Sequence, residues 1–481
     1  MNTILNLSSQ DLIHLTYNCL DTIYTYESSL AMEEELTSRS DKLQSLHTFQ
    51  QEKVNYYLLK IMNRGVRVDL DKKALLSKQL TKLMEEVENK FTYIIGEPFN
   101  PRSSTQMKAV YKDLLGVNLI KDPKSHSESC ASQYMFKYME QYPEYKLLTT
   151  LILEYRSLGV FLKTFVNAKV DEDGRLRTSF NCAGTKTGRL SSKKTPFNTG
   201  LNFQNIPSKG KIKLKYALSE MEDEENSEKG VDIDEEAEGV TELPNCKEFF
   251  IPDPNYTMFN IDFEGADAQI VAYESDCEWL INFFKAPPMK LYQYIASYYL
   301  QREISTSDKW YKIFKQFCHG TNYGMMEAKA AINAGIDLKD AKEIRKWYFA
   351  LCPEIPEWHK EIENKCKTQG YIENIFGRQL WFLNKDCPTW LNQAIASIPQ
   401  STIGDLTNRG LVNIEEKYEQ NLTSAHVLFQ VHDSLAGQYL TSDLTAPEII
   451  KQSMLIELPY KLPLIIGVDL ETSSISYGHC S

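Results

Sequence analysis

The strongest constraint on the fold is a short apolar run, VLFQVHDSL at residues 427–435, that ends in a histidine and an aspartate. A run of this length predicts a buried strand. An ionised carboxylate such as that of Asp433 is costly inside a protein unless it is paired or binds a metal. Asp433-Ser434 ending the strand as a plain turn is the simpler alternative, because both residue types favour turns. The chain must therefore place Asp433 either at a site or at an exposed turn.

A second apolar strand, within YTMFNIDFEGADAQI at residues 256–270, ends at Asp262, and Asp267 follows closely. Two aspartates about 4 Å apart repel each other by about 1 to 4 kcal/mol, and a divalent cation between them relieves this. Mg²⁺ prefers one or two carboxylates with waters and substrate phosphates, and two such ions suit an in-line phosphoryl displacement. The alternative is two unrelated acids at strand ends.

The segment KWYKIFKQFCHGTNYGMM, residues 309–326, has the pattern of a helix. Lys315, His319 and Tyr323 are spaced by four residues and so form one stripe, and Lys312 lies on a neighbouring face. A lysine can hold a phosphate as a point charge, and the flat rings can stack on a base. An amphipathic surface helix without a ligand is the alternative.

The segment at residues 184–211 has few large apolar residues, many hydroxyls, several lysines and Arg189. It is typical of a loop along a phosphate backbone. Its amides can bond acceptors in the minor groove; they belong to Asn202, Gln204 and Asn205. A plain solvated loop is again the alternative.

A net charge of −12 argues against binding to nucleic acid, unless the negative charge is confined to one segment. Residues 219–242 contain twelve acidic residues and one lysine, so the rest of the chain is close to neutral and can form a local basic cleft. We expect this acidic segment to be a solvated loop, with a partner-binding segment as the alternative.

Ten scattered cysteines indicate reduced thiols. With no apolar run long enough for a membrane and no secretory signal, a cytoplasmic protein is expected.

Apolar periodicity changes along the chain and predicts its organisation. Residues from about 45 to 165 have helical spacing, and strands are expected after about 168, among them KEFFIPD at residues 247–253. Helices return at 286–384, and strands return near the C-terminus. The predicted fold class is α+β, with helical lobes on a sheet.

Taken together and in this order, these segments resemble the polymerase region of family A DNA polymerases. The matching segments are TGRLSS (187–192), QNIP (204–207), DFEGAD (262–267, motif A), Lys315-x7-Tyr323-Gly324 (motif B), Gly377-Arg378, Gln400 and Val431-His432-Asp433 (motif C). The resemblance implies a right-hand fold with an antiparallel palm sheet and helical thumb and fingers. The domains it implies are an exonuclease-domain remnant at 1–44, mainly thumb at 45–165, the first part of the palm at 166–285 with an acidic insertion at about 216–243, fingers at 286–384 and the second part of the palm at 385–481.

By this resemblance, Asp262 and Asp433 bind two Mg²⁺ ions, with Mn²⁺ as a substitute, and the carbonyl of Phe263 adds a ligand. Lys315 would hold the dNTP triphosphate, Tyr323 would stack at the base-pair site, and Asp267 would exclude the ribose 2′-OH. The remaining nucleotide-binding residues would be His319, Lys312 and Tyr292. Primer–template DNA would be bound by Arg189, Gln204, Asn205, Gln400, His432 and Lys163.

Several residues depart from the family pattern. Tyr311 stands where many members have arginine, so Lys312 is expected to supply that charge. His319 replaces an aromatic residue, and Ser434 replaces a glutamate. Asp267 is one methylene shorter than the family's glutamate, which puts sugar discrimination in question.

The resemblance implies a phage-type polymerase that acts in DNA replication, and the leading segment favours a split or truncated one. Tyr17 and Asp21 resemble the last motif of a 3′–5′ exonuclease, whose other acids are missing, so proofreading would need a separate exonuclease chain or other replisome proteins. An ordinary helix with a chance match is the alternative. The rival activities are a single-subunit RNA polymerase, a DNA-binding protein without catalysis, and a nuclease.

Overall fold

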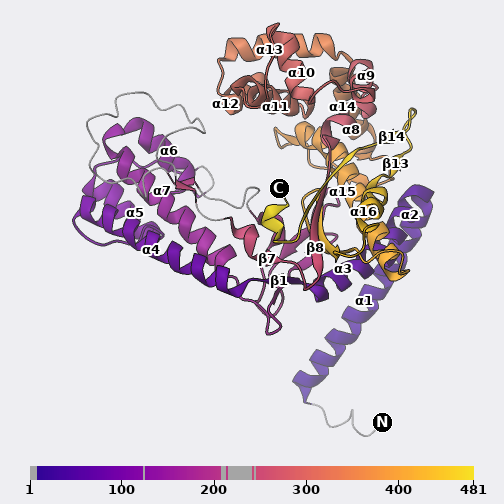
Figure 1. The fold of residues 1–481 in the computed structure, drawn as a ribbon, viewed down its shortest axis with the longest axis horizontal. Coiled ribbons are helices and arrows are strands. Elements are labelled where there is room, and N and C mark those ends of the chain that lie inside the picture. The colour runs from indigo at the N-terminus through magenta and orange to yellow at the C-terminus, as the bar shows by residue number, and fades with distance from the viewer. Residues whose placement is uncertain (1–7, 123–124, 207–212, 215–240, 243–244, 481) are drawn as a thin grey trace.

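The computed structural model describes residues 8–122, 125–206, 213–214, 241–242 and 245–480. Figure 1 shows a helical unit that contains α4 and α7 on one side, a second helical unit that contains α10–α13 on the other, and a sheet with β8 between them. The expected acidic insertion falls mostly outside the described residues. No helix in the described ranges is both long and apolar enough to cross a membrane.

The central sheet has four antiparallel strands in the order β11-β12-β8-β15. Their bounds are β8 Tyr256–Phe263, β11 His426–Val431, β12 Ser434–Leu440 and β15 Val468–Ser473. All six residues of β11 are buried, because the 30-residue helix α15, Trp390–Glu419, packs against the strand. This burial explains why the apolar run at 427–431 has no polar alternation. The two expected strands therefore become neighbours of β12.

The first helical unit consists of α4 Leu70–Ile95, α5 Ser104–Lys108, α6 Ser132–Gln141 and α7 Lys146–Phe161. The Asp69 side chain caps α4 by accepting a bond from the Lys72 amide. The helix ends at Gly96, whose φ of +88° suits glycine. Helix α4 packs along α7 through apolar residues spaced three and four apart, among them Leu76, Leu80 and Leu83.

The second helical unit has its own hydrophobic core, which extends from Ala268 to Ile398. Its helices are α8 Ala266–Glu274, α9 Glu278–Lys285, α10 Leu291–Leu300, α11 Lys309–Asn322, α12 Glu327–Ala334, α13 Leu338–Leu351 and α14 Glu354–Gln369, and its hairpin is β9 Tyr371–Glu373 with β10 Gln379–Trp381. This core thus begins within α8, before the expected start of the fingers at 286. The domain limits given above remain predictions.

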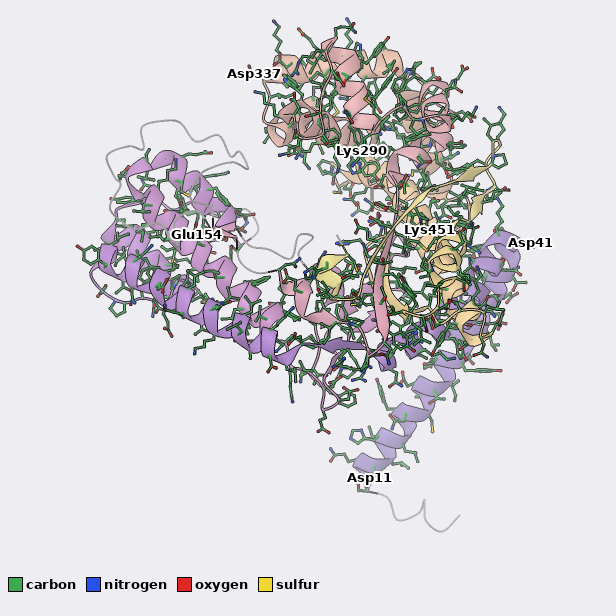
Figure 2. All side chains as sticks on the ribbon, in the orientation of Figure 1. Asp11, Asp41, Glu154, Lys290, Asp337 and Lys451 are labelled. Carbon is green, nitrogen blue, oxygen red and sulfur yellow. The ribbon has the colours of Figure 1, made fainter. Side chains whose placement is uncertain are left out.

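Two helices lead into the body of the chain. Helix α1, Ser9–Arg39, projects outward, and α2, Asp41–Thr48, lies against the body. Figure 2 shows this contrast, because Asp41 lies beside the body while Asp11 lies at the far end of the projecting helix. Helix α3, Asn55–Arg64, follows and ends at Gly65 as its sequence predicts, with a φ of +65°.

Short strands and a C-terminal helix complete the body. They are β1 Val66–Val68, β2 Arg175–Leu176, β3 Ser179–Asn181, β4 Ser191–Lys193, β5 Lys213–Leu214, β6 Thr241–Glu242, β7 Phe250–Ile251, α16 Ala446–Met454, β13 Glu457–Leu458 and β14 Leu464–Ile465. The expected strand KEFFIPD was largely wrong, because Cys246–Phe249 form a 3₁₀ turn that Asn245 caps. The α+β class is confirmed.

Candidate active site

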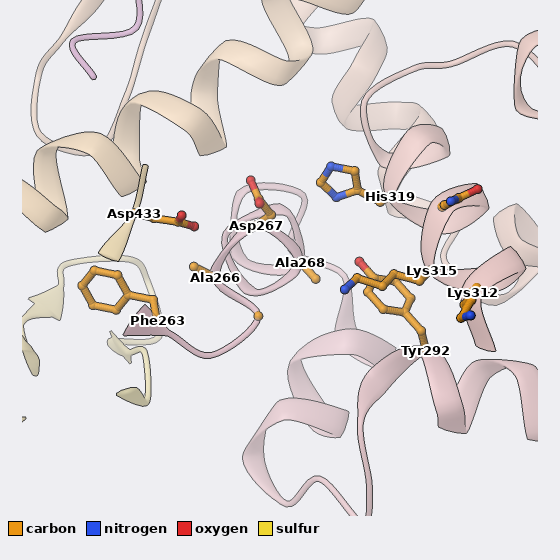
Figure 3. Close-up of a pocket in the computed structure, with 11 residues that line it drawn as sticks. Phe263, Ala266, Asp267, Ala268, Tyr292, Lys312, Lys315, His319 and Asp433 are labelled. Carbon is orange, nitrogen blue, oxygen red and sulfur yellow. The ribbon is translucent and has the colours of Figure 1, made fainter. Parts of the chain in front are cut away.

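Seven of the predicted site residues line one cavity of about 450 Å³ beside the central sheet, and Asp262 and Tyr323 are not among its lining residues. Figure 3 shows Asp433 and Phe263 at one side of this cavity, Lys312, Lys315 and Tyr292 at the other, and Asp267 and His319 between them. The remaining lining residues are Gly265, Ala266, Ala268 and Gln316. Residues from motifs A, B and C, which are separated by up to 170 positions in the sequence, thus share one cavity.

Asp433 lies in the two-residue turn between β11 and β12, because Val431 pairs directly with Ser434. The turn that the sequence offered as the simpler alternative is therefore present, and it places Asp433 at the cavity. His432 has a φ of +56°, a conformation that non-glycine residues adopt rarely. Its amide donates a hydrogen bond to Gln204 Oε1 at 2.8 Å. This contact fixes the turn against the QNIP segment.

Asp262 lies near the end of β8 and is half-buried. Burial and, next, the negative charge of Asp433 raise the pKa of Asp262 to about 6. The Phe263 amide counteracts this shift by donating a hydrogen bond to Asp262 Oδ1 at 2.9 Å. Two acids that repel each other at a cavity wall are a favourable place for a cation, because the cation removes that repulsion.

The donors at this corner fit a hard divalent cation. The Asp262 and Asp433 carboxylates and a main-chain carbonyl at Phe263 are all oxygen donors, which Mg²⁺ and Mn²⁺ prefer. Across the part of the chain that the structure describes, no group of three or more His, Cys, Asp or Glu side chains is arranged for a metal ion. Any ion at this corner therefore depends on the two aspartates, with substrate oxygens and waters to complete its shell.

Helix α11 supplies one wall of the cavity, where Lys312 and Lys315 bring positive charge and His319 adds its ring. The side chain of Asp308 caps this helix by accepting a hydrogen bond from the Trp310 amide at 2.9 Å. The helix ends at Asn322, and Tyr323 then follows as its cap. The expected stripe is maintained at this end, because the His319 and Tyr323 ring centroids are 4.5 Å apart.

The Tyr323 hydroxyl donates a hydrogen bond to Asp267 Oδ1. Burial and the nearby Asp267 charge raise the pKa of Tyr323, so the hydroxyl keeps its proton. Burial likewise raises the pKa of Tyr292, which lines the same cavity. Asp267 lies in the first turn of α8, where the helix dipole favours a carboxylate. Asp267, which is predicted to face the nucleotide sugar, is thus positioned by α8 and by Tyr323 at the end of α11.

Arg189 lies on the loop before β4, and its charge acts on Tyr323. The neighbouring Gly188 has a φ of +74°, and an added Cβ would come within 2.2 Å of the Arg378 guanidinium. Arg378 is paired with Asp405, which is only 2% exposed, at 2.5 Å. The predicted Gly377-Arg378 segment therefore packs against the TGRLSS loop.

None of the six predicted DNA-binding residues lines the cavity. Lys163 is exposed on the turn after α7, Asn205 lies in the turn at residues 203–205, and Gln400 is half-buried on α15. The sequence also missed two contacts. Gln430 on β11 accepts a hydrogen bond from Gln204 at its carbonyl, at 3.0 Å. Asp469 on β15 pairs in register with Asp262, and no motif in the sequence marks it.

The comparisons with known proteins agree with this geometry. A family model described as DNA polymerase family A matches residues 71–476. The chain is 25% identical over 442 residues to the thermostable DNA polymerase I of Thermus filiformis, covering 89% of this chain and 48% of that protein. It is also 25% identical over 475 residues to DNA polymerase I of Helicobacter pylori, covering 96% and 46%. The chain thus spans about half the length of the curated relatives it matches.

Among solved structures, the chain is similar to the POL domain of Pol1 from M. smegmatis, in complex with DNA primer–template and dNTP. The TM-score is 0.72 at 20% sequence identity, with 91% of this chain and 72% of that chain covered. This likeness confirms the predicted right-hand fold.

Proposed function

The chain belongs to DNA polymerase family A, and we propose on that premise that it is a template-directed DNA polymerase. It adds dNTPs to a primer 3′-OH by nucleotidyl transfer, with primer–template DNA and dNTPs as its substrates. The observation that supports this best is the shared cavity of motifs A, B and C, with Asp433, Asp267 and Lys315 on its walls. Loss of the family's chemistry is disfavoured, because both aspartates and Lys315 are present and adjacent to that cavity.

We assign the roles of the cavity residues as follows. Asp262 and Asp433 bind two divalent cations, which when bound lower the pKa of the primer hydroxyl and neutralise charge on the departing pyrophosphate. Lys315 binds the triphosphate as a point charge, and Lys312 adds a second positive charge on the same helix. Tyr323 and His319, whose ring planes are tilted by 59° to each other, offer aromatic faces for the incoming base, and Tyr292 lies beside the triphosphate. Asp267 contacts the sugar of the incoming nucleotide.

The primer terminus would lie at the β11–β12 turn. His432 presents its side chain there while Gln204 holds its amide. Arg189, Asn205 and Gln400 would contact the minor-groove face of the new duplex without reading its sequence. Lys163 would contact the phosphate backbone further along the duplex. These assignments divide the predicted DNA contacts between the β11–β12 turn, the segment at residues 189–205, helix α15 and the turn after α7.

A primer-extension assay tests this function and separates it from the RNA polymerase alternative. A labelled primer on a DNA template is mixed with the chain, Mg²⁺ and either dNTPs or NTPs. We expect extension with dNTPs and little with NTPs, and we expect the matched variant Asp262→Asn to bind the duplex without extending it. A preference for NTPs would replace the proposal with an RNA polymerase, and extension by Asp262→Asn at the wild-type rate would remove Asp262 from catalysis.

We also propose that the chain is a phage-type polymerase acting in DNA replication in the host cytoplasm, with proofreading supplied by a separate exonuclease chain. Tyr17 and Asp21 lie one turn apart on α1, Tyr17 is 65% exposed, and the described residues include no acidic metal cluster beside them. A mismatched, end-labelled primer should therefore keep its length when incubated with the chain and Mg²⁺. Shortening from the 3′ end would contradict this proposal.

A further inference from the structure

A buried polar network joins the β9–β10 hairpin to α15, and none of the roles proposed above uses it. Asn374 is 2% exposed, and its Oδ1 accepts hydrogen bonds from the main-chain amides of Phe376 at 3.0 Å and Arg378 at 2.9 Å. Its Nδ2 donates to Asp405 Oδ2 on α15 at 2.9 Å. Buried polar groups that are satisfied in this way make a structure rigid. The turn between β9 and β10 is therefore fixed to α15.

The Arg378 side chain lies at the centre of this network. Its Nε donates to Asp405 Oδ2 at 3.0 Å, and its Nη2 donates to Asp405 Oδ1 at 2.5 Å. The two side chains are 15% and 2% exposed. A pair with two parallel hydrogen bonds fixes the plane of the guanidinium as well as its position. Because Asp405 neutralises its charge, Arg378 is better suited to support a neighbouring segment than to bind a DNA phosphate.

The segment that Arg378 supports is the TGRLSS loop, which together with residues 182–186 joins β3 to β4. Gly188 in this loop has a φ of +74°, and an added Cβ there would overlap the guanidinium, so the loop backbone lies directly on it. Arg378 Nη2 also donates to Gln50 Oε1 at 3.2 Å, and Gln50 Nε2 donates to the Cys182 carbonyl at 2.9 Å. Arg378 thus contacts this connection directly near one end and through Gln50 near the other.

Arg189 follows Gly188 and is held mainly by its main chain and its aliphatic stem. An added Cβ at Gly404 on α15 would come within 3.1 Å of Arg189 Cγ and 3.4 Å of the Arg189 amide nitrogen, so the residue packs closely on that helix. The Thr185 hydroxyl donates to the Arg189 carbonyl at 2.7 Å. Among the described residues, by contrast, the buried Arg189 Nε has no hydrogen-bond partner. The direction of the Arg189 side chain therefore depends on where its loop lies.

We propose that Arg378 is a positioning residue for DNA binding. Held by Asp405, its guanidinium sets the position of the TGRLSS loop beside α15 and so directs Arg189 toward the minor-groove face of the duplex. The hairpin is also held from α2, because Gly377, with a φ of +90°, packs so closely on Lys42 that an added Cβ would come within 2.6 Å of the Lys42 Cβ. This inference rests on the proposed function, which places Arg189 at the duplex.

A double-mutant cycle on duplex affinity tests this proposal. The Kd of a fluorescein-labelled primer–template is measured by anisotropy, without nucleotide, for the wild type, Arg378→Lys, Arg189→Ala and the double variant. Arg378→Lys keeps the charge beside Asp405 but loses the two parallel bonds and the planar support, so its Kd should rise about 5-fold. Arg189→Ala should raise the Kd about 10-fold. In the Arg189→Ala background, Arg378→Lys should raise the Kd by less than about 2-fold, because the side chain that it positions is absent.

Arg64→Lys is the matched control. Arg64 also makes a two-bond pair with a buried acid of α15, Glu415, at 2.8 and 3.0 Å, and its hydrogen bonds run to Glu415 and Val427 rather than to the TGRLSS loop. The Kd of Arg64→Lys should stay within about 2-fold of the wild type, because a loss of stability alone leaves the affinity of the folded protein unchanged. Urea unfolding verifies that each variant is folded under the assay conditions.

Each of three results would overturn the positioning role. They are an equal rise in Kd from Arg378→Lys in both backgrounds, an unchanged Kd in Arg378→Lys or in Arg189→Ala, and a rise in Arg64→Lys as large as that in Arg378→Lys. Failure of the proposed function gives a different result, because the wild type would then bind the duplex without extending it with dNTPs.

Discussion

The Tyr323 hydroxyl donates a hydrogen bond to Asp267 Oδ1 and so joins the end of α11 to the first turn of α8. The two side chains come from different motifs, and Asp267 lines the same cavity as Lys315. An aspartate reaches less far than the glutamate of the family pattern, yet the contact to tyrosine is made. The carboxylate of Asp267, hydrogen-bonded to Tyr323, therefore lies in the cavity wall that would contact the nucleotide sugar.

Replacing Asp267 should weaken discrimination between sugars. Asp267→Ala removes the carboxylate that would meet a 2′-OH, so the ratio of kcat/KM for a dNTP to that for the matching NTP should fall by about 10 to 10³-fold. Asp267→Glu keeps the acid and should retain most of the ratio. Single-nucleotide incorporation on a defined template measures both variants, and an unchanged ratio in Asp267→Ala would assign sugar selection elsewhere.

Lys315 should matter far more than another lysine on the same helix. Lys315→Ala removes a charge from the cavity wall, and kcat/KM for dNTP incorporation should fall by about 10² to 10³-fold. Lys309 lies exposed at the start of α11 and does not line the cavity. Lys309→Ala should therefore change kcat/KM by less than about 3-fold. Equal losses in the two variants would argue against a specific phosphate contact at Lys315.

The body should depend on a buried ion pair between α3 and α15. Glu415 is fully buried, pairs with Arg64 at 2.8 Å, and accepts a hydrogen bond from the Val427 amide at 2.7 Å. Glu415→Gln leaves the Arg64 charge uncompensated and should lower the free energy of unfolding by about 3 to 5 kcal/mol. Glu419→Gln breaks the more exposed ion pair between Glu419 and Lys60. It should lower the free energy of unfolding by less than about 1 kcal/mol. Urea unfolding measures both, and similar losses would contradict this account.

His426 should make the fold sensitive to acid. Its Nδ1–H donates to the Ser424 carbonyl, and its Nε2 accepts from Gln438, so the neutral ring is fully bonded. Burial, assisted by the positive charge of Arg64, lowers the pKa of His426 to about 3. Because the unfolded chain takes up a proton near pH 6.5 and the folded chain does not, stability from this residue is complete above that pH and falls as the pH drops toward 3.

The expected slope is at most about 1.4 kcal/mol per pH unit over this window. His426→Gln removes the titrating group, so its free energy of unfolding should depend less steeply on pH between 6.5 and 4 than that of the wild type. Urea unfolding at several pH values measures both slopes. Two parallel curves would mean that His426 does not contribute to the acid sensitivity.

The sequence could predict those parts of the site that continuous patterns determine. Asp262 and Asp433 were identified because apolar runs end at them, and Lys315, His319 and Tyr323 because their spacing matches a helix. Contacts that depend on strand register could not be predicted in this way. Asp469 meets Asp262 only because β15 pairs with β8, and Gln204 reaches Gln430 across the fold. The KEFF segment was misassigned because an Asn245 cap outweighed its strand-like composition.

The most direct test of the central claim is to locate the metal ions. Crystals of the chain with primer–template, Mn²⁺ and a non-hydrolysable dNTP would be measured at the manganese absorption edge. We predict two anomalous peaks between the Asp262 and Asp433 carboxylates, with the triphosphate directed toward Lys315. Peaks that lie elsewhere, or carboxylates too far apart to share an ion, would contradict the proposed mechanism.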